Sequence, residues 1–295
     1  MTQTVVGAGL AVFLTVVACS HSDGTPTTTA GGTVDLRSDR LTGDQAWQSV
    51  VPVCWTGNGD QAQRLFREPV RVRTSATADP IESSVMAMTQ AQPADTDYGS
   101  MWSPITSLGT SFSRGVITLD LPSTAVSQSL DADRAELAVQ QMVHTAVAAA
   151  QSSGLVTGGD LPQVRILVDG ESGQEVFGSY SLPDKLSADP AALAGVSLEP
   201  ERLQVEPGVL TVSGRVTDPV HDVELTVESL DGEAEVLQRM AVNQDYSRAE
   251  TAMSGVEVTR TVTLEAGTYR VTITATDADG KALSDDFVVT VAEPE

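Results

Sequence analysis

The hydrophobic period of this chain changes near residue 197, and this change constrains the fold more than any other feature. After that point apolar residues recur at every second position, as at Leu210 and Val212 and again at Val271 and Ile273. A period of two places successive side chains on opposite faces of a strand. Because such strands follow one another with Gly and Asp between them, residues 197–293 are predicted to fold as an antiparallel β-sandwich.

Strand and helix patterns instead alternate between residues 47 and 180. Short apolar or alternating runs predict strands at 51–55, 69–73, 115–122 and 164–168. A first helix is predicted over residues 80–91, with Asp79 as its N-cap, a proline in the first turn and Glu82 three residues after the cap.

A second helix is predicted from Asp133, taken as its N-cap, to a stop at Gly154. Its apolar residues between Ala135 and Ala149 form one continuous stripe. Together these elements predict an α+β domain over residues 47–180, with an antiparallel or mixed sheet and two helices packed on one face of it.

Three segments of this domain follow one another in a distinctive order. They are the strand GVITLDLPS, the helix AELAVQQMVHTAVAA with Thr145 inside it, and the strand VRILVDGE. In order and spacing they resemble the GerMN domain of bacterial sporulation and germination lipoproteins, over roughly residues 50–178. The resemblance implies a module similar to the ring-building modules of envelope complexes, and it brings no catalytic residue with it.

The second half of the chain also contains a motif that resembles one in a known class of folds. Gly267-Thr-Tyr269 precedes an alternating strand and is similar to the tyrosine corner of immunoglobulin-like folds. Residues 197–293 also resemble the immunoglobulin-like module that often follows GerMN domains. The fold expected for the whole chain is therefore an α+β domain followed by an all-β immunoglobulin-like sandwich, joined by a linker at 181–196.

The N-terminal segment indicates export and lipid attachment. Val5 to Ala18 is an uncharged apolar run, shorter than the ~20 residues of a membrane-spanning helix and typical of a signal peptide. Ala18 directly before Cys19 resembles the lipobox of bacterial lipoproteins, which implies a signal peptide at 1–18 and acylation of Cys19, for example with palmitate. Residues 19–46 would form a flexible tether. A cleaved signal with an unmodified Cys19 is the alternative.

The charge of the chain limits its partners. A formal net charge of −23 repels the phosphates of nucleic acids and of anionic lipid headgroups. We therefore expect no nucleic-acid partner and contact with the membrane only through the lipid on Cys19. Protein partners in the cell envelope are expected, with self-association as one form of them.

The residues that carry catalytic chemistry are few and scattered. His21 lies in the tether, His144 falls opposite the apolar stripe of its helix and is expected to be exposed, and His221 precedes a strand of the other domain. Cys54, within an apolar run, is expected to be a buried thiol. Without a nucleophile and base in reach of each other, we expect neither enzymatic activity nor a cofactor or metal.

Two binding alternatives stay open. A calcium site is one possibility, because carboxylates lie close together in the sequence at Asp277, Asp279, Asp285 and Asp286. A hairpin turn explains Asp279-Gly280 equally well. A cell-wall glycan site would need exposed aromatic platforms, and the tryptophans Trp47, Trp55 and Trp102 are the main candidates in a chain with 4% aromatic residues. The leading expectation is a lipid-anchored, extracytoplasmic protein that binds or scaffolds envelope proteins.

Overall fold

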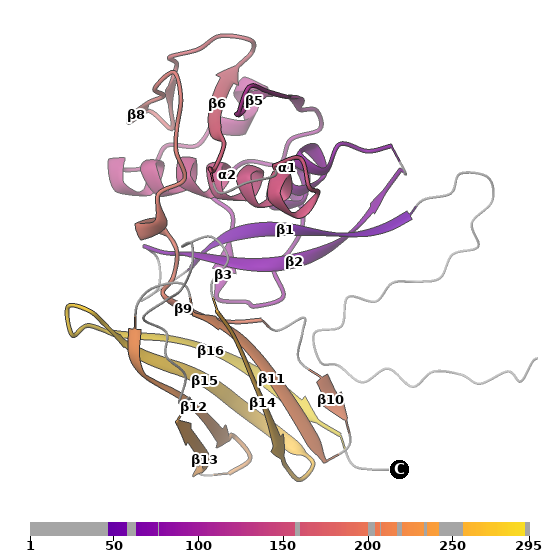
Figure 1. Ribbon diagram of the computed structural model, residues 1–295, viewed down its shortest axis with the longest axis vertical. Helices are drawn as coiled ribbons and strands as arrows, with labels where there is room; N and C mark the ends of the chain where they lie inside the picture. The colour runs from indigo at the N-terminus through magenta and orange to yellow at the C-terminus, as the bar shows by residue number, and fades with distance from the viewer. Residues whose placement is uncertain are drawn as a thin grey trace, which may run out of the picture. The chain divides into compact units, whose positions relative to one another are not determined.

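The computed structural model describes most of the chain after residue 46 (Figure 1). The described residues are 47–57, 63–75, 77–156, 160–199, 204–206, 208–216, 220–232, 235–241 and 256–292. The predicted signal peptide, the tether, Cys19 and His21 lie outside them.

The first sheet is antiparallel and has the order β2-β1-β3. Its strands are β1 (Trp47–Gly57), β2 (Leu65–Thr74) and β3 (Tyr98–Gly99). The predicted strands at 51–55 and 69–73 are confirmed: they lie within β1 and within the second half of β2. Strand β3 pairs with β1 only at Thr56 and Gly57, so no strand of the described residues lies beside most of that edge of β1.

The first helix, α1 (Pro80–Gln90), begins as predicted. The Asp79 side chain accepts hydrogen bonds from the N–H groups of Ile81 and Glu82, at 2.7 and 3.1 Å. These bonds satisfy two of the amides that an α-helix leaves free at its start.

A second sheet has the order β4-β5-β6, with β5 and β6 parallel. Its strands are β4 (Gly109–Ser113), β5 (Val116–Leu121) and β6 (Gln163–Val168), which confirms the strands predicted at 115–122 and 164–168. A short 3-10 helix (Ser123–Val126) and the long helix α2 (Ala132–Ser152) connect β5 to β6. Residues 169 and 170 form the tight turn expected after β6, both with positive φ.

The N-cap of α2 is Asp131, so the prediction of Asp133 is wrong. Asp131 has extended backbone angles and its side chain accepts from the N–H of Arg134 at 3.0 Å, as an N-cap must. Asp133 lies inside the first turn, where its negative charge still favours the helix N-terminus.

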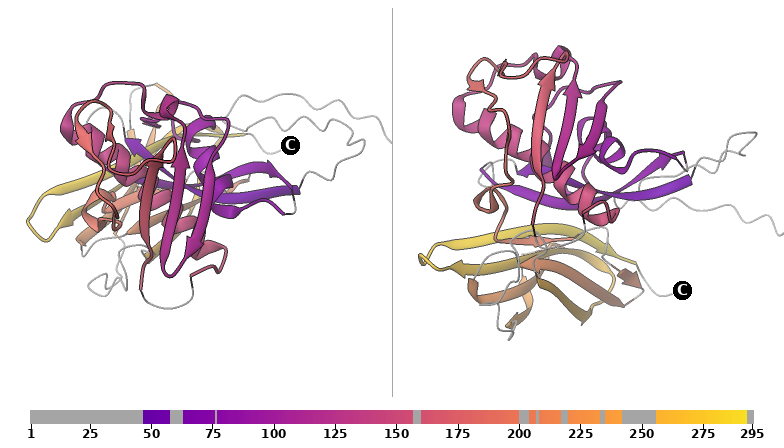
Figure 2. Two further views of the ribbon diagram at one scale, coloured as in Figure 1. Left: turned by 90° about the horizontal axis from the view of Figure 1, so that it is seen from above. Right: turned by 45° about the horizontal axis from the view of Figure 1, so that its top comes forward.

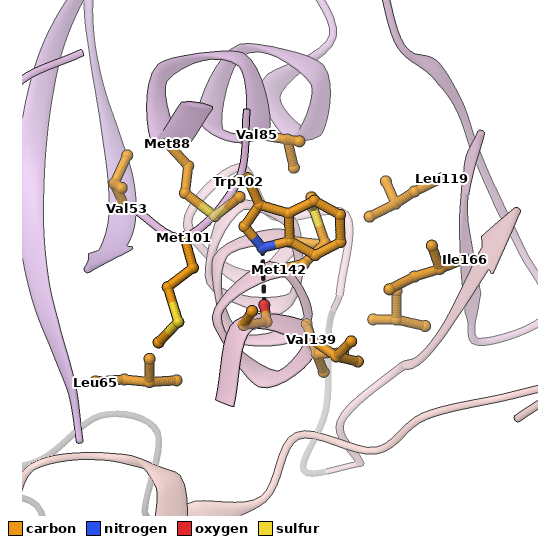
Figure 3. Close-up of a cluster of buried hydrophobic side chains, with 14 of the residues drawn as sticks. Val53, Leu65, Val85, Met88, Met101, Trp102, Leu119, Val139, Met142 and Ile166 are labelled. Carbon is orange, nitrogen blue, oxygen red and sulfur yellow. Dashed lines mark hydrogen bonds between the residues drawn. The ribbon is translucent and has the colours of Figure 1, made fainter. Parts of the chain in front are cut away.

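The helices contact two sheets, whereas one sheet with helices on one face was expected. Figure 2 shows the ribbons of the two sheets and the two helices. One core, called here the first core, contains buried side chains from both sheets and both helices (Figure 3). Val53 and Leu65 approach the helices from the first sheet, and Leu119 and Ile166 approach from the second. A helix between two layers buries most of its circumference, which a one-sided apolar stripe does not reveal.

Residues after β6 complete this region. The strands β7 (Glu175–Val176) and β8 (Tyr180–Ser181) pair with each other, and a 3-10 helix spans Pro190–Ala192. Several apolar side chains of this stretch are buried in the first core: Val176, Phe177, Leu182, Leu186, Ala192, Leu193 and Ala194.

The region from residue 196 onward is built of antiparallel strands, as predicted. They are β9 (Val196–Leu198), β10 (Gln204–Glu206), β11 (Val209–Val216), β12 (Val220–Ser229), β13 (Glu235–Ala241), β14 (Val256–Thr263), β15 (Gly267–Asp277) and β16 (Ala282–Val291). One sheet has the order β10-β11-β14 with β9 also on β11, and the other has the order β13-β12-β15-β16. Their inward side chains form a second core, separate from the first.

Tyr269 makes the contact expected of a tyrosine corner. The side chain is buried, and its hydroxyl donates to the carbonyl of Glu265, four residues upstream, at 2.8 Å. This bond fixes the turn that leads from β14 into β15.

Candidate functional site

His144 is buried, so the prediction of an exposed residue is wrong. Its relative exposure is 0%, because α2 is enclosed between layers and has no solvated face at this position. The Nε2 atom lies 2.8 Å from the carbonyl of Asp189. A carbonyl only accepts, so Nε2 carries the hydrogen and Nδ1 is the basic atom of the ring.

The environment of His144 opposes its protonation. Nδ1 is buried and has no hydrogen-bond partner among the described residues. Burial lowers the pKa of His144 to about 4; the positive charge of Arg67 acts in the same direction, and the bond to Asp189 partly opposes it. The ring is therefore neutral at pH 7 and has no path to a substrate from solvent.

The other histidine that the structure describes lies elsewhere. His221 is exposed on β12, where Nε2 is 3.7 Å from a carboxylate oxygen of Asp222. His144 is buried on α2 and His221 lies on a strand of the second region, so the two do not share a site.

Cys54 is buried, as predicted. Its exposure is 0%, and burial raises the pKa of the thiol even though Arg67 and Thr145 favour the thiolate. Arg67 is the cross-strand neighbour of Cys54 on β2, a contact that the sequence around Cys54 does not reveal. The thiol is therefore protonated and enclosed, which makes it a poor nucleophile.

Two side chains of α2 form hydrogen bonds with the backbone of β1 beyond the point where β3 ends. The hydroxyl of Thr145 accepts from the N–H of Cys54 at 3.1 Å, and the amide of Gln141 donates to the carbonyl of Cys54 at 2.9 Å. Gln141 and Thr145 are four residues apart, so they lie on the same face of the helix. They replace the neighbouring strand that this stretch of β1 lacks.

The tryptophans expected to offer a glycan platform are core residues where the structure describes their side chains. Trp55 and Trp102 are 0% and 3% exposed. The indole N–H of Trp102 donates to the carbonyl of Ala138 on α2 at 2.8 Å (Figure 3). Neither ring is available to stack on a sugar.

The aspartates considered for calcium do not form one site. Asp277 closes the hairpin between β15 and β16, where its side chain accepts from the N–H groups of Asp279 and Lys281. Asp285 is buried farther along β16. Among the described residues, no three or more acidic, histidine or cysteine side chains are arranged to hold a metal ion.

Three buried carboxyls have raised pKa values, and the sequence had pointed only to Asp285 among them, as a calcium candidate. We call Glu68, Asp95 and Asp285 the carboxyl cluster; their exposures are 0%, 2% and 1%. Glu68, on β2, accepts from the N–H groups of Ala94 and Asp95, at 3.0 and 3.1 Å. It thereby holds the loop between α1 and β3 against the sheet.

Tyr98 connects this loop to the second region. Its ring stacks on Phe66 with centroids 4.4 Å apart, and its hydroxyl donates to Asp285 Oδ2 at 2.8 Å. The same oxygen accepts from the N–H of Leu198 on β9. Asp285 therefore receives hydrogen bonds from a residue of the first core and from one of the second.

The cluster favours protonated carboxyls. Burial raises the pKa of Glu68 to about 7 and that of Asp285 to about 7, in each case against the hydrogen bonds that they accept. Burial also raises the pKa of Asp95 to about 6, and the charges of Asp97 and Asp286 add to this effect. The Oδ2 atom of Asp95 has no hydrogen-bond partner among the described residues.

No helix within the described part of the chain is both long enough and apolar enough to cross a membrane.

Three solved structures show limited similarity. The tandem GerMN domains of the sporulation protein GerM from Bacillus subtilis are 14% identical, with a TM-score of 0.32 over 51% of this chain and 50% of that one. This chain thus spans about half the length of that relative. A provisionally named lipoprotein from Clostridium perfringens is 12% identical, with a TM-score of 0.31 over 50% of this chain and 93% of that one.

The third is a superoxide reductase from Nanoarchaeum equitans, 12% identical, with a TM-score of 0.24 over 36% of this chain and 96% of that one. Such low TM-scores support no conclusion. No curated protein matches the sequence.

The comparison of families gives a definite result for the first region. Residues 52–174 match the Germane family, described as sporulation and spore germination. The match covers both helices and the strands β4, β5 and β6 in full, and it begins inside β1. It agrees with the resemblance seen in the three motifs of this region. Residues 52–174 of the chain therefore form a GerMN (Germane) domain.

Proposed function

We propose that this protein is a lipid-anchored protein of the cell envelope that binds or scaffolds protein partners outside the cytoplasm and catalyses no reaction. The observation that carries the proposal is the Germane match over residues 52–174, together with a leader that ends in Ala18-Cys19. A sporulation or germination role follows the description of that family, and a general envelope role is the wider form of the proposal.

The burial of the reactive side chains supports binding over catalysis. Cys54, His144 and Glu68 are the strongest candidates for chemistry in the first region, and each has an exposure of 0%. A catalytic group must come within hydrogen-bond reach of a substrate, which these residues cannot do without opening the core.

The second region is proposed to be an immunoglobulin-like sandwich that extends the reach of the Germane domain. Two antiparallel sheets with one core between them and the Tyr269–Glu265 corner support this assignment. Such folds serve many functions, so the fold alone does not identify a ligand.

Site-specific photo-crosslinking in intact cells tests the binding role. A crosslinker at Ser111 or Ser113, both exposed on β4, reports on the Germane domain, and one at Thr261 on β14 serves as a matched exposed position in the second region. We expect one or a few defined protein adducts in the membrane fraction, and a loss of these adducts in the Cys19→Ala variant.

Position-dependent adducts with a defined envelope protein, or with a second copy of this chain, would support the proposal. An absence of defined adducts at all three positions, while the protein stays folded and membrane-bound, would contradict it.

A further inference from the structure

The two long strands of the first sheet extend past the core of their own domain. They pair continuously up to the point where Trp47 lies opposite Thr74. Figure 1 shows β1 and β2 running side by side to this end, which we call the ribbon end and define as residues 47–50 and 71–74. The side chains described there are exposed or half-buried, whereas the next residue of β1, Val51, belongs to the first core. The ribbon end is therefore available to a partner.

One face of the ribbon end combines an apolar side chain with two cations. Val50 lies opposite Arg71, and Gln48 lies opposite Arg73. Opposite residues of an antiparallel pair share a face of the sheet, and so do residues two apart on one strand. Both arginines are exposed, and the exposed fraction of Val50, 60%, is the highest of any large apolar side chain that the structure describes.

This face is positive in a chain that is strongly negative elsewhere. The chain has 40 acidic and 17 basic residues, yet the acidic residue of β1 and β2 is Glu68 alone, and it is buried. Among the described residues, none forms an ion pair with Arg71. The ribbon end is therefore complementary to a negatively charged partner.

The position of the ribbon end in the chain indicates which partner this is. Residues 19–46 are the predicted tether, and they lead directly into β1 at Trp47. In the proposed function the lipid on Cys19 thus holds the ribbon end, before any other part of the folded chain, within reach of the membrane. A peptide added as a further strand fits less well, because Pro52 has no N–H to donate along β1.

We propose that the ribbon end docks on an anionic lipid surface. Arg71 and Arg73 would bind lipid phosphates, which match the planar guanidinium group, and Val50 would enter the interface between headgroups and acyl chains. The proposal rests on the lipid anchor of the proposed function. It adds a second contact to the lipid-only contact expected from the net charge.

The anchor makes a weak contact of this kind sufficient. An arginine near an anionic surface favours binding by roughly fivefold, so two of them favour it by roughly 25-fold. That factor cannot bring a free protein with a net charge of −23 to the membrane. A tethered protein already has an effective concentration of about millimolar at the surface. Repulsion of the acidic remainder of the chain then favours the orientation in which the ribbon end faces the lipid.

A fluorescent label at position 48 of the acylated full-length protein tests the docking. In Gln48→Cys the new thiol is exposed on the docking face, whereas Cys54 is buried and Cys19 carries the lipid of the proposed function. The label is a nitrobenzoxadiazole group, whose emission rises in an apolar environment. We expect emission about twofold higher in phosphatidylcholine vesicles with about 30% phosphatidylglycerol than in pure phosphatidylcholine, and no such rise in about 0.5 M NaCl.

Arg71→Glu, made in the labelled protein, identifies the residue responsible. It reverses one exposed charge of the docking face and should shrink the rise in emission at least about threefold. Lys281→Glu is the matched control: it makes the same change of charge at an exposed turn of the second region. The rise in this control should stay within about 1.5-fold of the parent value. Arg73→Gln replaces Arg71→Glu as the test should that variant fail to fold.

Flotation of the same vesicles separates the docking from the anchor. A protein that floats with both kinds of vesicle, but whose emission is the same on both, is anchored and does not dock; this result would overturn the docking and leave the proposed function standing. An equal loss of emission in Arg71→Glu and Lys281→Glu would also overturn it. A protein that floats with neither kind of vesicle has no anchor, which would contradict the proposed function and the docking with it.

Discussion

The hydroxyl of Thr145 accepts a hydrogen bond from the backbone N–H of Cys54, 91 positions earlier in the chain, and so ties helix α2 to strand β1. Gln141 binds the carbonyl of the same residue. A backbone amide buried without a partner costs about 1–3 kcal/mol, so these two side chains make it possible for β1 to run past the end of β3 inside the core.

Thr145→Val should therefore lower the free energy of unfolding by about 1–3 kcal/mol, because valine keeps the shape and removes the acceptor. Thr89→Val is a suitable control: Thr89 is also buried on a helix, but its hydroxyl donates to the carbonyl of Met86 in its own helix. Urea unfolding of both variants measures the difference. Equal losses in the two variants would show that the bond to Cys54 has no special role.

His144 should make the protein less stable in acid. Its pKa falls to about 4 in the folded state and is about 6.5 in an unfolded chain, so the unfolded state binds more protons between these values. The stabilisation is complete above pH 6.5, and roughly 3 kcal/mol of it is lost as the pH falls through 4.

The carboxyl cluster acts in the opposite direction over part of this range, so the contribution of His144 is best measured as a difference. His144→Gln keeps a donor for the Asp189 carbonyl and does not titrate. Subtracting its unfolding free energy from that of the wild-type protein, at each pH from 4 to 8, should leave a curve that rises with pH and levels off near 6.5. A flat difference would mean that His144 is not the group responsible.

Tyr269→Phe should cost about 1 kcal/mol, because it removes the hydroxyl that binds Glu265 and leaves the buried ring in place. Tyr180→Phe, at a half-exposed position, should change the unfolding free energy by less than about 0.5 kcal/mol. Thermal unfolding of the two variants tests this contrast, and an unchanged melting temperature in Tyr269→Phe would contradict the structural role of the corner.

Gly214→Ala should disturb the pairing of β9 with β11. An added Cβ would lie 2.9 Å from the carbonyl oxygen of Ser197, closer than real Cβ atoms approach backbone oxygen. We expect a destabilisation of about 1–3 kcal/mol and faster amide exchange at residues 196–198. Normal stability in this variant would show that β9 can move away from β11 without loss.

The sequence predicts most of the elements of this fold because local patterns are strong in it. Asp79-Pro80 and the alternation around Val271 each contain enough local information to define an element. For the second helix, the sequence does not show which faces are buried. Its many alanines are apolar on nearly every side, so a helical projection cannot show that His144 is enclosed.

The carboxyl cluster could not be predicted, because its members lie far apart in the sequence and meet only through the fold. The local signal at Glu68 is weak: it is one of four charged residues in β2, next to Arg67, and nothing in the strand sets it apart as a buried one. Asp285 resembles a surface aspartate next to Asp286, and only the approach of Tyr98 and Leu198 shows that it is buried.

Mass spectrometry of the N-terminus of the native protein, isolated from membranes of the producing cell, tests the proposed placement most directly. We expect the mature chain to begin at Cys19 and to carry a diacylglyceryl group, since two acyl chains suffice for stable anchoring. A chain that retains residues 1–18, or one that begins at Cys19 without any acyl group, would contradict a lipid-anchored envelope protein.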